Sequence, residues 1–349
     1  MKLETEKIPY KQLTHEVIAP TNGRSAALTI LGTLFLLFLI NWGVIWLGRT
    51  YPDNRGYWLV RQKWELLYRL DEPVDWLILG DSSGNQGVVP EVLEGRLGGT
   101  AVNLNTVGAM GATDDAWMLE EYISRFGPPP QVLIVHTYDA WPRNVAPIFL
   151  AKTPLPWGSW QNVYTPPVLM TGQEKLNVWL TRYFPLYADN VTLGKLIRGW
   201  IFDQTPIFQT RFHLQENGYM PLAAPPASPY IDTDLQDHFG RVANKFSLSQ
   251  SNRQALAQLV ALADTNKIEM YIAFGPLYGE LVKDERFQAY YLAERAALQA
   301  ITDQSTHVHL LETLATFPAD QMENVDHLIF EAAKVYTGML ADEIEEIRP

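Results

Sequence analysis

A long stretch without charged residues near the N-terminus constrains this chain most. No charged residue lies between Arg24 and Arg49, and residues 26–48 are almost wholly apolar. A helix that crosses the hydrocarbon core of a bilayer needs about 20 apolar residues, so this stretch is long enough. Trp42 and Trp46 near its end are typical of the aromatic belt at a membrane surface. The sequence therefore predicts one membrane-spanning helix over residues 26–48.

Two other interpretations fit this stretch less well. A cleavable signal peptide is disfavoured by the long polar segment before the run, by the length of the run and by the lack of a small-residue cleavage site. A buried helix of a soluble fold rarely contains an apolar run of this length. We therefore expect an uncleaved anchor, with a polar tail over residues 1–25 and a juxtamembrane connector over residues 49–72. The connector could pack on the membrane surface or on the domain.

Charge and composition exclude several classes of function. Basic residues flank the anchor on both sides, and a large domain is translocated largely regardless of them, so they do not set the orientation. The chain has no cysteine, which excludes disulfides, thiolate metal sites and a cysteine nucleophile. Absence of thiols suits an oxidising compartment and favours an extracytoplasmic domain. A net charge of −12 without a basic stripe makes nucleic acid a poor partner.

Strand-like and helix-like segments alternate after the connector. Short apolar runs predict five strands, over residues 76–79, 101–104, 132–135, 270–274 and 308–311. Helical periodicity predicts helices over residues 114–126, 254–264, 284–301 and 330–347. Thr113 or Asp114 is expected to be the N-cap of the first of these helices. The alternation predicts an α/β domain over residues 73–349, with a three-layer α/β/α architecture and a mainly parallel five-stranded sheet.

One long segment interrupts this alternation. Residues 142–245 are rich in Pro, Trp and Tyr and show no comparable sequence of strands. A structureless loop of this length inside a compact domain is improbable. The segment is therefore expected to be an inserted subdomain or lid.

The residues most suggestive of chemistry follow the first predicted strand. Gly80-Asp81-Ser82-Ser83-Gly84 breaks the apolar run, so Ser82 lies just past the carboxyl end of a strand, where open α/β sheets bind ligands. Asp81 is expected to bond local backbone N–H groups and to set the turn. Far downstream, His327 precedes the last predicted helix and could be the base for a Ser82 nucleophile.

The pentapeptide also fits the G-x-S-x-G nucleophile elbow of α/β-hydrolases. In that fold the nucleophile follows a central strand, whereas only the anchor and the connector precede Ser82. Non-catalytic roles are also open at this point, a simple turn or cap for Ser82 and a surface or capping position for His327.

Four sequence blocks together resemble the SGNH (GDSL-type) hydrolase superfamily, particularly its membrane-anchored bacterial members linked to acyl modification of cell-envelope glycans. Gly80-Asp81-Ser82 matches the first block. Residues 105–113 match the second, with Gly111 the better counterpart of its glycine and Gly108 the second choice. The other two blocks read His136-Thr137-Tyr138-Asp139 and Asn324-Val325-Asp326-His327. The resemblance covers about residues 75–140 and 250–347.

The resemblance implies a serine-dependent carboxylic-ester hydrolase or O-acyltransferase. Ser82 would be the nucleophile and His327 the base, and the backbone N–H groups of Ser82 and Gly111 would bind the oxyanion. Tyr138 stands where the family has an oxyanion-binding asparagine, and Asn324 stands where it has the acid that orients the histidine. Asp326 could take the place of that acid.

The resemblance also implies partners and a location. The substrate would be an acyl ester, first of all an O-acetyl ester, on an envelope or exported polysaccharide. The expected partners are the bilayer through residues 26–48, the acylated glycan and a membrane O-acyltransferase, and no cofactor is expected. The protein would be a single-pass protein of the bacterial cytoplasmic membrane with its large domain outside. The alternative is a non-catalytic glycan-binding or assembly partner of such an acyltransferase, which the two altered blocks favour.

Three further histidines are weaker candidates for a site. His307 and His309 are two apart on a predicted strand and therefore share a face. No third ligand is evident, so a strand-edge pair is expected in place of a metal site. His136 follows the third strand and is expected either to line the cleft, as Asp139 would, or to be a buried packing residue.

Overall fold

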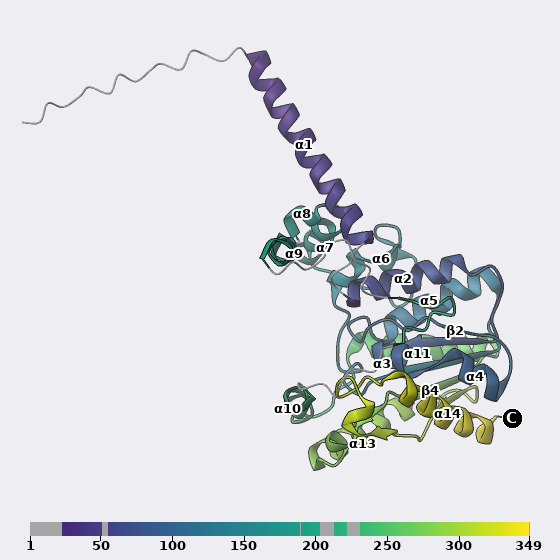
Figure 1. Cartoon of the computed structure of the whole chain (residues 1–349). Coiled ribbons are helices and arrows are strands. Elements are labelled where there is room, and N and C mark those ends of the chain that lie inside the picture. The colour runs from purple at the N-terminus through teal and green to yellow at the C-terminus, as the bar shows by residue number, and fades with distance from the viewer. Residues whose placement is uncertain (1–22, 51–54, 189, 203–212, 222–230, 349) are drawn as a thin grey trace, which may run out of the picture.

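The apolar stretch predicted to be an anchor forms a single long helix, called the anchor helix, that extends away from the folded domain (Figure 1). The computed structural model describes residues 23–50, 55–188, 190–202, 213–221 and 231–348. Helix α1 spans Gly23–Thr50, and its apolar side chains are mostly exposed. Within the described residues, Gly23–Arg49 is the one helix long and apolar enough to cross a membrane, with a mean hydropathy of 2.2. It contains the predicted span, whereas residues 1–22 of the predicted tail lie outside the described residues.

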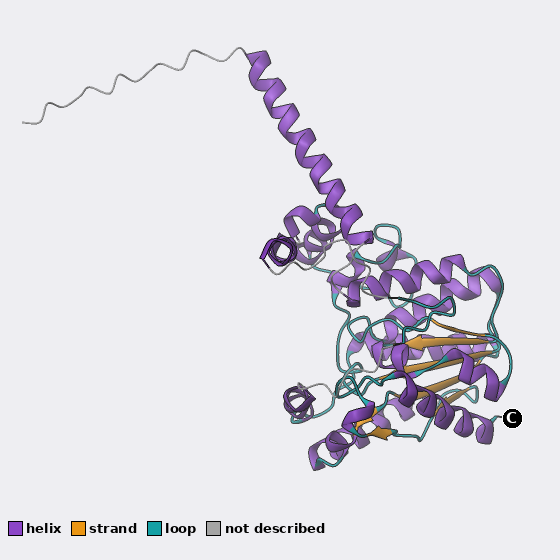
Figure 2. Cartoon of the chain, in the orientation of Figure 1, coloured by secondary structure: helices purple, strands orange, loops and turns teal. Residues whose placement is uncertain are grey.

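The core of the domain is a five-stranded, wholly parallel sheet in the order β2-β1-β3-β4-β6 (Figure 2). Its strands are β1 (Trp76–Gly80), β2 (Ala101–Asn103), β3 (Gln131–His136), β4 (Glu269–Phe274) and β6 (Val308–Leu310). The three central strands β1, β3 and β4 are buried almost throughout, as expected for parallel strands covered on both faces. The predicted fold class is confirmed.

Helices cover both faces of this sheet (Figure 1). Helices α5 (Ala112–Phe126) and α11 (Gln250–Asn266) pack against each other, and α13 (Glu285–Thr302) packs against α11. On the opposite face, α3 (Ser82–Gly87) and α4 (Pro90–Leu97) pack against the C-terminal helix α14 (Phe330–Ile347). The four helices predicted from periodicity are all present, with ends that differ by a few residues at most.

The connector folds onto the domain. Helix α2 (Arg55–Arg69) buries Trp64 and Leu67 completely. Lys63 on the same helix is also fully buried, and its Nζ donates to the carbonyls of Asn103 at 2.7 Å and Gly218 at 2.5 Å. Burial lowers the pKa of Lys63 well below its usual range. The three acceptors around Nζ, which include Oδ1 of Asn103 at 3.0 Å, satisfy the hydrogen bonds that this buried amine requires.

The regular structure described in the segment between β3 and α11 is helical. The helices are η1 (Pro147–Ala151), α6 (Ser159–Asn162), α7 (Gly172–Tyr183), α8 (Pro185–Ala188), α9 (Asn190–Phe202) and α10 (Ile231–Val242). Helix α8 contacts α1, and α10 packs on α12 (Gly279–Val282) and α13. The segment therefore contacts both the anchor and the domain.

A second, two-stranded sheet was not predicted. It pairs β5 (Leu277–Tyr278) with β7 (Thr316–Phe317) in parallel. The 3-10 helix η2 (Ala319–Gln321) follows β7. Each strand has only two residues, too few for a hydrophobic alternation to be visible in the sequence. The small sheet lies just beyond the carboxyl end of β4.

The predicted N-cap of α5 was wrong. The cap is Gly111, with a φ of +57°, and Thr113 and Asp114 lie buried in the first turn. The Oδ1 atom of Asn252, on α11, accepts a hydrogen bond at 3.0 Å from the first helical N–H group, that of Ala112. A side chain remote in sequence therefore provides the capping bond, and Asp114 is free to accept from Trp64 Nε1 at 2.9 Å and from Thr106 at 2.8 Å.

The burial of Asp114 leads to a test by pH. Burial raises the pKa of Asp114 to about 7. An unfolded aspartate has a pKa of about 4, so the folded state binds more protons between about pH 4 and 7, and stability falls as the pH rises through that window. We expect Asp114→Asn to remove this part of the fall, on the order of a few kcal/mol. Urea unfolding of both full-length proteins in detergent at pH 5 and pH 8 measures it, and parallel pH dependences would contradict it.

Candidate active site

Ser82 lies in a tight turn between β1 and α3. Gly80, the last residue of β1, has a φ of +132°, and a Cβ atom there would lie 1.9 Å from the carbonyl oxygen of Val135. Only glycine therefore allows the neighbouring strand to approach so closely. Asp81 caps α3, because its Oδ1 accepts from the backbone N–H of Ser83 at 2.9 Å and from the Ser83 hydroxyl at 2.6 Å. Ser82 is half-buried at the first position of the helix, whereas Ser83 is fully buried.

A buried ionic cluster of Asp81, His136 and Asp115 packs against this turn. Asp81 Oδ2 accepts from the backbone N–H of Thr137 at 2.9 Å and lies 3.4 Å from Nδ1 of His136. The other ring nitrogen of His136 lies 2.6 Å from Asp115 Oδ2. Burial alone would lower the pKa of His136, but Asp115 and Asp81 outweigh it and raise the pKa to about 10. His136 is only 1% exposed, so of its two predicted roles the structure favours the packing residue.

The loop after β2 adjoins the same turn. The backbone N–H of Thr106 donates to the carbonyl of Gly80 at 2.8 Å. A Cβ atom at Gly108 would lie 3.6 Å from Oδ2 of Asp81, so this glycine contacts the turn directly. A Cβ atom at Gly111 would lie 2.3 Å from Oδ1 of Asn252. Gly111 thus allows the close approach of Asn252 that caps α5, and Gly108 is the candidate glycine that contacts Asp81.

His327 is held by two oxygen acceptors at one ring nitrogen. Its Nδ1 lies 2.8 Å from Oδ1 of Asn324 and 2.6 Å from Oδ1 of Asp326. The carboxylate is closer and charged, so it is the stronger of the two acceptors for an Nδ1 proton. Burial would raise the pKa of Asp326, but the charge and hydrogen bond of His327 outweigh it, and the pKa is lowered. With a proton on Nδ1, Nε2 is the nitrogen of a neutral imidazole that accepts a proton.

The loop that carries His327 is fixed to the carboxyl edge of the sheet. The carbonyl of Val325 accepts from the backbone N–H of Tyr278, in the strand β5 that follows β4. The backbone N–H of Val325 donates to Asp234 of α10 at 3.1 Å. Ser82 follows β1, so the structure brings both residues to the same edge of the parallel sheet, and α3 packs against the helix α14 that follows His327.

Tyr138 and Asp139 follow β3 at this edge. Tyr138 is 1% exposed, and its hydroxyl lies 2.7 Å from Nδ1 of His238 in α10. Burial raises the pKa of Tyr138 above its usual range. Asp139 forms ion pairs with Arg143 and Arg241. The hydroxyl that the resemblance would direct at an oxyanion is therefore already engaged by a histidine of the inserted segment.

The sequence patterns did not reveal several residues that surround these groups. Arg143 and His238 both act electrostatically on Asp326, and Arg241 acts on Tyr138. Asn252 donates from Nδ2 to the carbonyls of Ala140 and Trp141, both at 2.9 Å, and so fixes the chain after Asp139. Arg143, His238 and Arg241 lie in the inserted segment, which none of the four sequence blocks covers. In the sequence, the one hint of their role was that basic residues and a histidine occur within a segment rich in aromatic residues.

His307 and His309 belong to the opposite edge of the sheet. His307 Nδ1 lies 2.7 Å from Glu269 Oε1, and His309 Nε2 lies 3.1 Å from Glu269 Oε2. Glu269 is the first residue of β4, so all three mark the amino edge. Among the described residues, no group of three or more His, Asp or Glu side chains is arranged to hold a metal ion.

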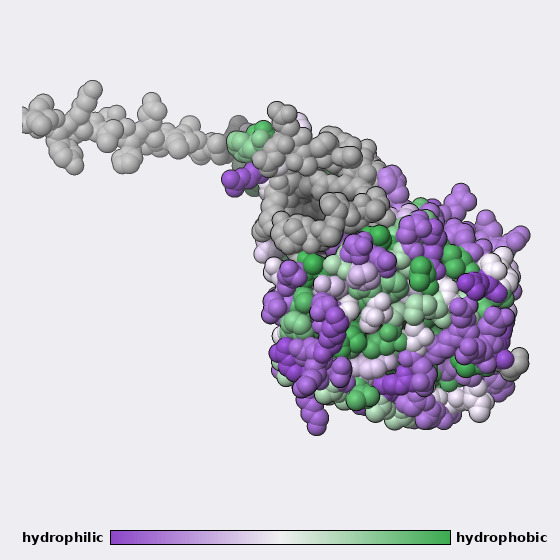
Figure 3. All heavy atoms as spheres, turned by 60° about the horizontal axis from the view of Figure 1, so that its bottom comes forward, coloured by the Kyte–Doolittle hydropathy of each residue, from purple (hydrophilic) through white to green (hydrophobic). Residues whose placement is uncertain are grey.

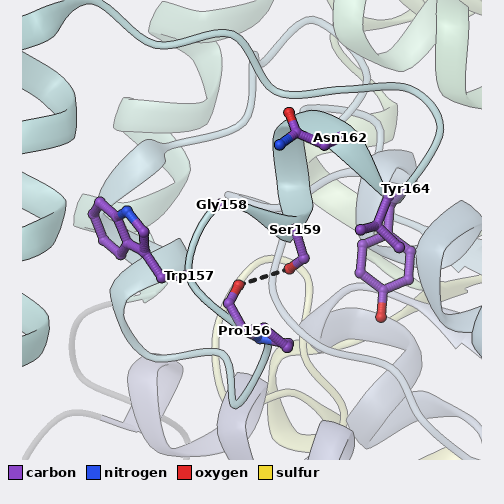
Figure 4. A pocket seen from close by; sticks show the side chains of 7 residues that line it. Pro156, Trp157, Gly158, Ser159, Asn162 and Tyr164 are labelled. Carbon is purple, nitrogen blue, oxygen red and sulfur yellow. Dashed lines mark hydrogen bonds between the residues drawn. The ribbon is translucent and has the colours of Figure 1, made fainter.

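A pocket lies in the inserted segment (Figure 4). It has a volume of about 220 Å³ and is lined by residues 156–159 and 162–164, so none of the candidate site residues contributes to it. Within it the Ser159 hydroxyl donates to the carbonyl of Pro156 at 2.8 Å. That bond fixes the turn before α6, and the pocket is separate from the Ser82 edge.

No protein-family model and no curated protein matches this chain. Its chemistry therefore has to be argued from the residues at the carboxyl edge of the sheet.

Proposed function

We propose that this chain is a membrane-anchored, extracytoplasmic serine esterase or acyltransferase of the SGNH type. Its substrate would be an acyl ester, first of all an O-acetyl ester, of a cell-envelope or exported polysaccharide. The observation that carries the proposal is that a half-buried Ser82 after β1 lies at the same sheet edge as a histidine whose Nδ1 is held by Asp326 and Asn324. A serine hydroxyl and an oriented imidazole are the two groups that nucleophilic acyl transfer requires.

The mechanism follows from these roles. Ser82 Oγ attacks the acyl carbonyl while His327 Nε2 takes the hydroxyl proton, and Asp326 stabilises the imidazolium that forms. Backbone N–H groups of Ser82 and of the glycine loop, at Gly108 or Gly111, would hold the oxyanion. Collapse releases the sugar hydroxyl, which receives the proton from His327, and leaves an acyl-serine. Water resolves it to the carboxylic acid, whereas a second sugar hydroxyl accepts the acyl group in a transfer reaction.

One observation favours a second candidate function. The Tyr138 hydroxyl, which would replace the oxyanion-binding asparagine of the family, is buried and engaged by His238. Loss of one oxyanion donor typically costs about 100- to 1,000-fold in rate. The second candidate is therefore a non-catalytic domain that binds the glycan or assists a membrane O-acyltransferase.

Covalent labelling separates these two candidates. We expect a fluorophosphonate probe to label the full chain in detergent on Ser82, because an activated serine reacts with it and an ordinary turn serine does not. Labelling should be lost in Ser82→Ala and strongly reduced in His327→Ala. It should persist in Ser305→Ala, since Ser305 lies next to His307 at the opposite edge of the sheet. Peptide mass mapping locates the adduct, and a folded wild-type protein without an adduct would favour the binding role.

A further inference from the structure

Helix α8 packs against the anchor helix α1, and α7 and α9 both pack against α8 (Figure 1). The contact is specific, because Asn41 in α1 donates from Nδ2 to the carbonyl of Tyr183 at 2.7 Å and accepts from the backbone N–H of Leu186 at 3.3 Å. Asn41 is 8% exposed, in a helix whose other side chains are mostly exposed. An amide within the apolar run therefore fixes the start of α8 to the anchor.

This contact sets the height of α7–α9 along the anchor. About 20 helical residues cross the hydrocarbon core of a bilayer, so a span that begins at residue 26 leaves the hydrocarbon near residue 45. At about 1.5 Å per residue, Asn41 lies roughly 6 Å inside that end. Tyr183 and Leu186, bonded to Asn41, therefore lie just inside the edge of the hydrocarbon core, next to the headgroup region.

These helices expose many large apolar and aromatic side chains. Tyr187 is 68% exposed, Phe202 is 74% exposed, and seven more large apolar residues of α7–α9 and their junctions are also exposed. These seven are Leu176, Trp179, Tyr183, Phe184, Ile197, Trp200 and Ile201. Exposed apolar surface on this scale marks an interaction site, and Trp and Tyr are the residues enriched where a membrane meets water.

Other described parts of the domain lack such a concentration. Outside α1 and residues 157–202, the exposed large apolar residues are Tyr68, Leu292, Val335, Met339 and Ile347. The face seen in Figure 3, which turns the side opposite the anchor forward, has hydrophilic residues around its apolar ones. The apolar surface is therefore gathered where the anchor is attached.

Charge points to the same partner. Residues 172–202 contain four basic residues and two acidic ones, in a chain whose net charge is −12. The basic residues are Lys175, Arg182, Lys195 and Arg198. Lys175 and Arg198 are exposed, whereas Arg182 is half-buried and donates to the carbonyl of Leu155 at 2.6 Å. An aromatic and basic helical surface is the composition that binds the interface of a bilayer containing anionic lipids.

We propose that α7–α9 form a second membrane contact, seated in the interfacial region of the lipid bilayer beside the span. The domain is then held to the membrane at two elements, which fixes its orientation relative to the bilayer. This second contact requires α1 to be a membrane span, as in the proposed function, and is independent of the chemistry proposed for Ser82.

The absence of cysteine allows a direct test. The single-cysteine variants Tyr187→Cys and Phe202→Cys probe the proposed contact. The variant Phe38→Cys in α1 reports whether the anchor is inserted. Leu292→Cys on α13, where the native side chain is 66% exposed, is the matched control. Each full-length protein carries an NBD fluorophore in vesicles of phosphatidylcholine and phosphatidylglycerol. Lipids with a spin label close to the headgroup should quench the probes at 187 and 202 several-fold more than the probe at 292.

The result at position 38 separates the two ways in which the proposal fails. If probe 38 is quenched by lipids labelled deep in the acyl chain while probes 187 and 202 match probe 292, the anchor is inserted and the second contact is overturned. The same result would point to a protein partner for this surface. If probe 38 is not quenched, α1 does not span and the proposal falls with it. Serine labelling of the detergent-solubilised protein is unaffected by either result.

Discussion

Replacing Asp326 with alanine is expected to lower kcat on a chromogenic acetyl ester by roughly 10³- to 10⁴-fold, with little change in KM. Asp326 lies 2.6 Å from Nδ1 of His327, and its pKa is lowered mainly because His327 outweighs the cost of burial. A carboxylate in this position holds the imidazole in the productive tautomer and stabilises the imidazolium, and its loss costs about 10⁴-fold in serine hydrolases. Steady-state kinetics of the full chain in detergent measure the effect.

Asn324→Ala is the matched control, because Asn324 Oδ1 also lies near Nδ1, at 2.8 Å. A neutral amide acceptor contributes about 0.5–1.5 kcal/mol, so its removal should cost no more than roughly tenfold in rate. If Asn324→Ala proved the more damaging of the two, the amide, and not the carboxylate, would orient His327. Both variants keep Ser82 and the residues of its turn, so the comparison concerns the acceptors of His327 and not the nucleophile.

The sheet was predictable because parallel strands buried on both faces read as continuous apolar runs. Trp76–Gly80 and Gln131–His136 both have this pattern, and their order along the chain placed Ser82 and Tyr138 at one edge. The glycine turn was also visible in the sequence. The structure explains why glycine is required there, since a Cβ atom at Gly80 would collide with the carbonyl oxygen of Val135. Local patterns therefore defined the scaffold and the position of the candidate nucleophile.

Contacts between remote residues were not predictable. The cap of α5 depends on Asn252, which accepts a hydrogen bond from the backbone N–H of Ala112, 140 positions earlier in the chain. The partner of Tyr138 is His238, 100 positions away in the inserted segment. The pentapeptide defined the turn of Ser82, but not the ionic support beneath it, since Asp115 and His136 carry no local pattern that pairs them. That support is the part of the site that stability measurements can test.

Replacing His136 with leucine is expected to destabilise the protein by about 3–5 kcal/mol, because it leaves two buried carboxylates without their cation. Asp81 and Asp115 are both buried, and His136 lies 3.4 Å and 2.6 Å from them. Its pKa of about 10, against about 6.5 when unfolded, means that its stabilisation is complete below about pH 6.5 and is lost as the pH rises towards 10. Urea unfolding of the full chain in detergent at pH 6 and pH 9 measures both effects.

His309→Leu provides the comparison, since His309 pairs with Glu269 at 3.1 Å in a position about a quarter exposed. Such a pair contributes about 0–1 kcal/mol, so the two histidine variants should differ by several-fold in destabilisation. Adding Asp115→Leu to His136→Leu should recover part of the loss, because one uncompensated buried charge is then removed. Equal destabilisation by His136→Leu and His309→Leu, with no recovery in the double variant, would mean that the turn of Ser82 does not depend on a buried ionic cluster.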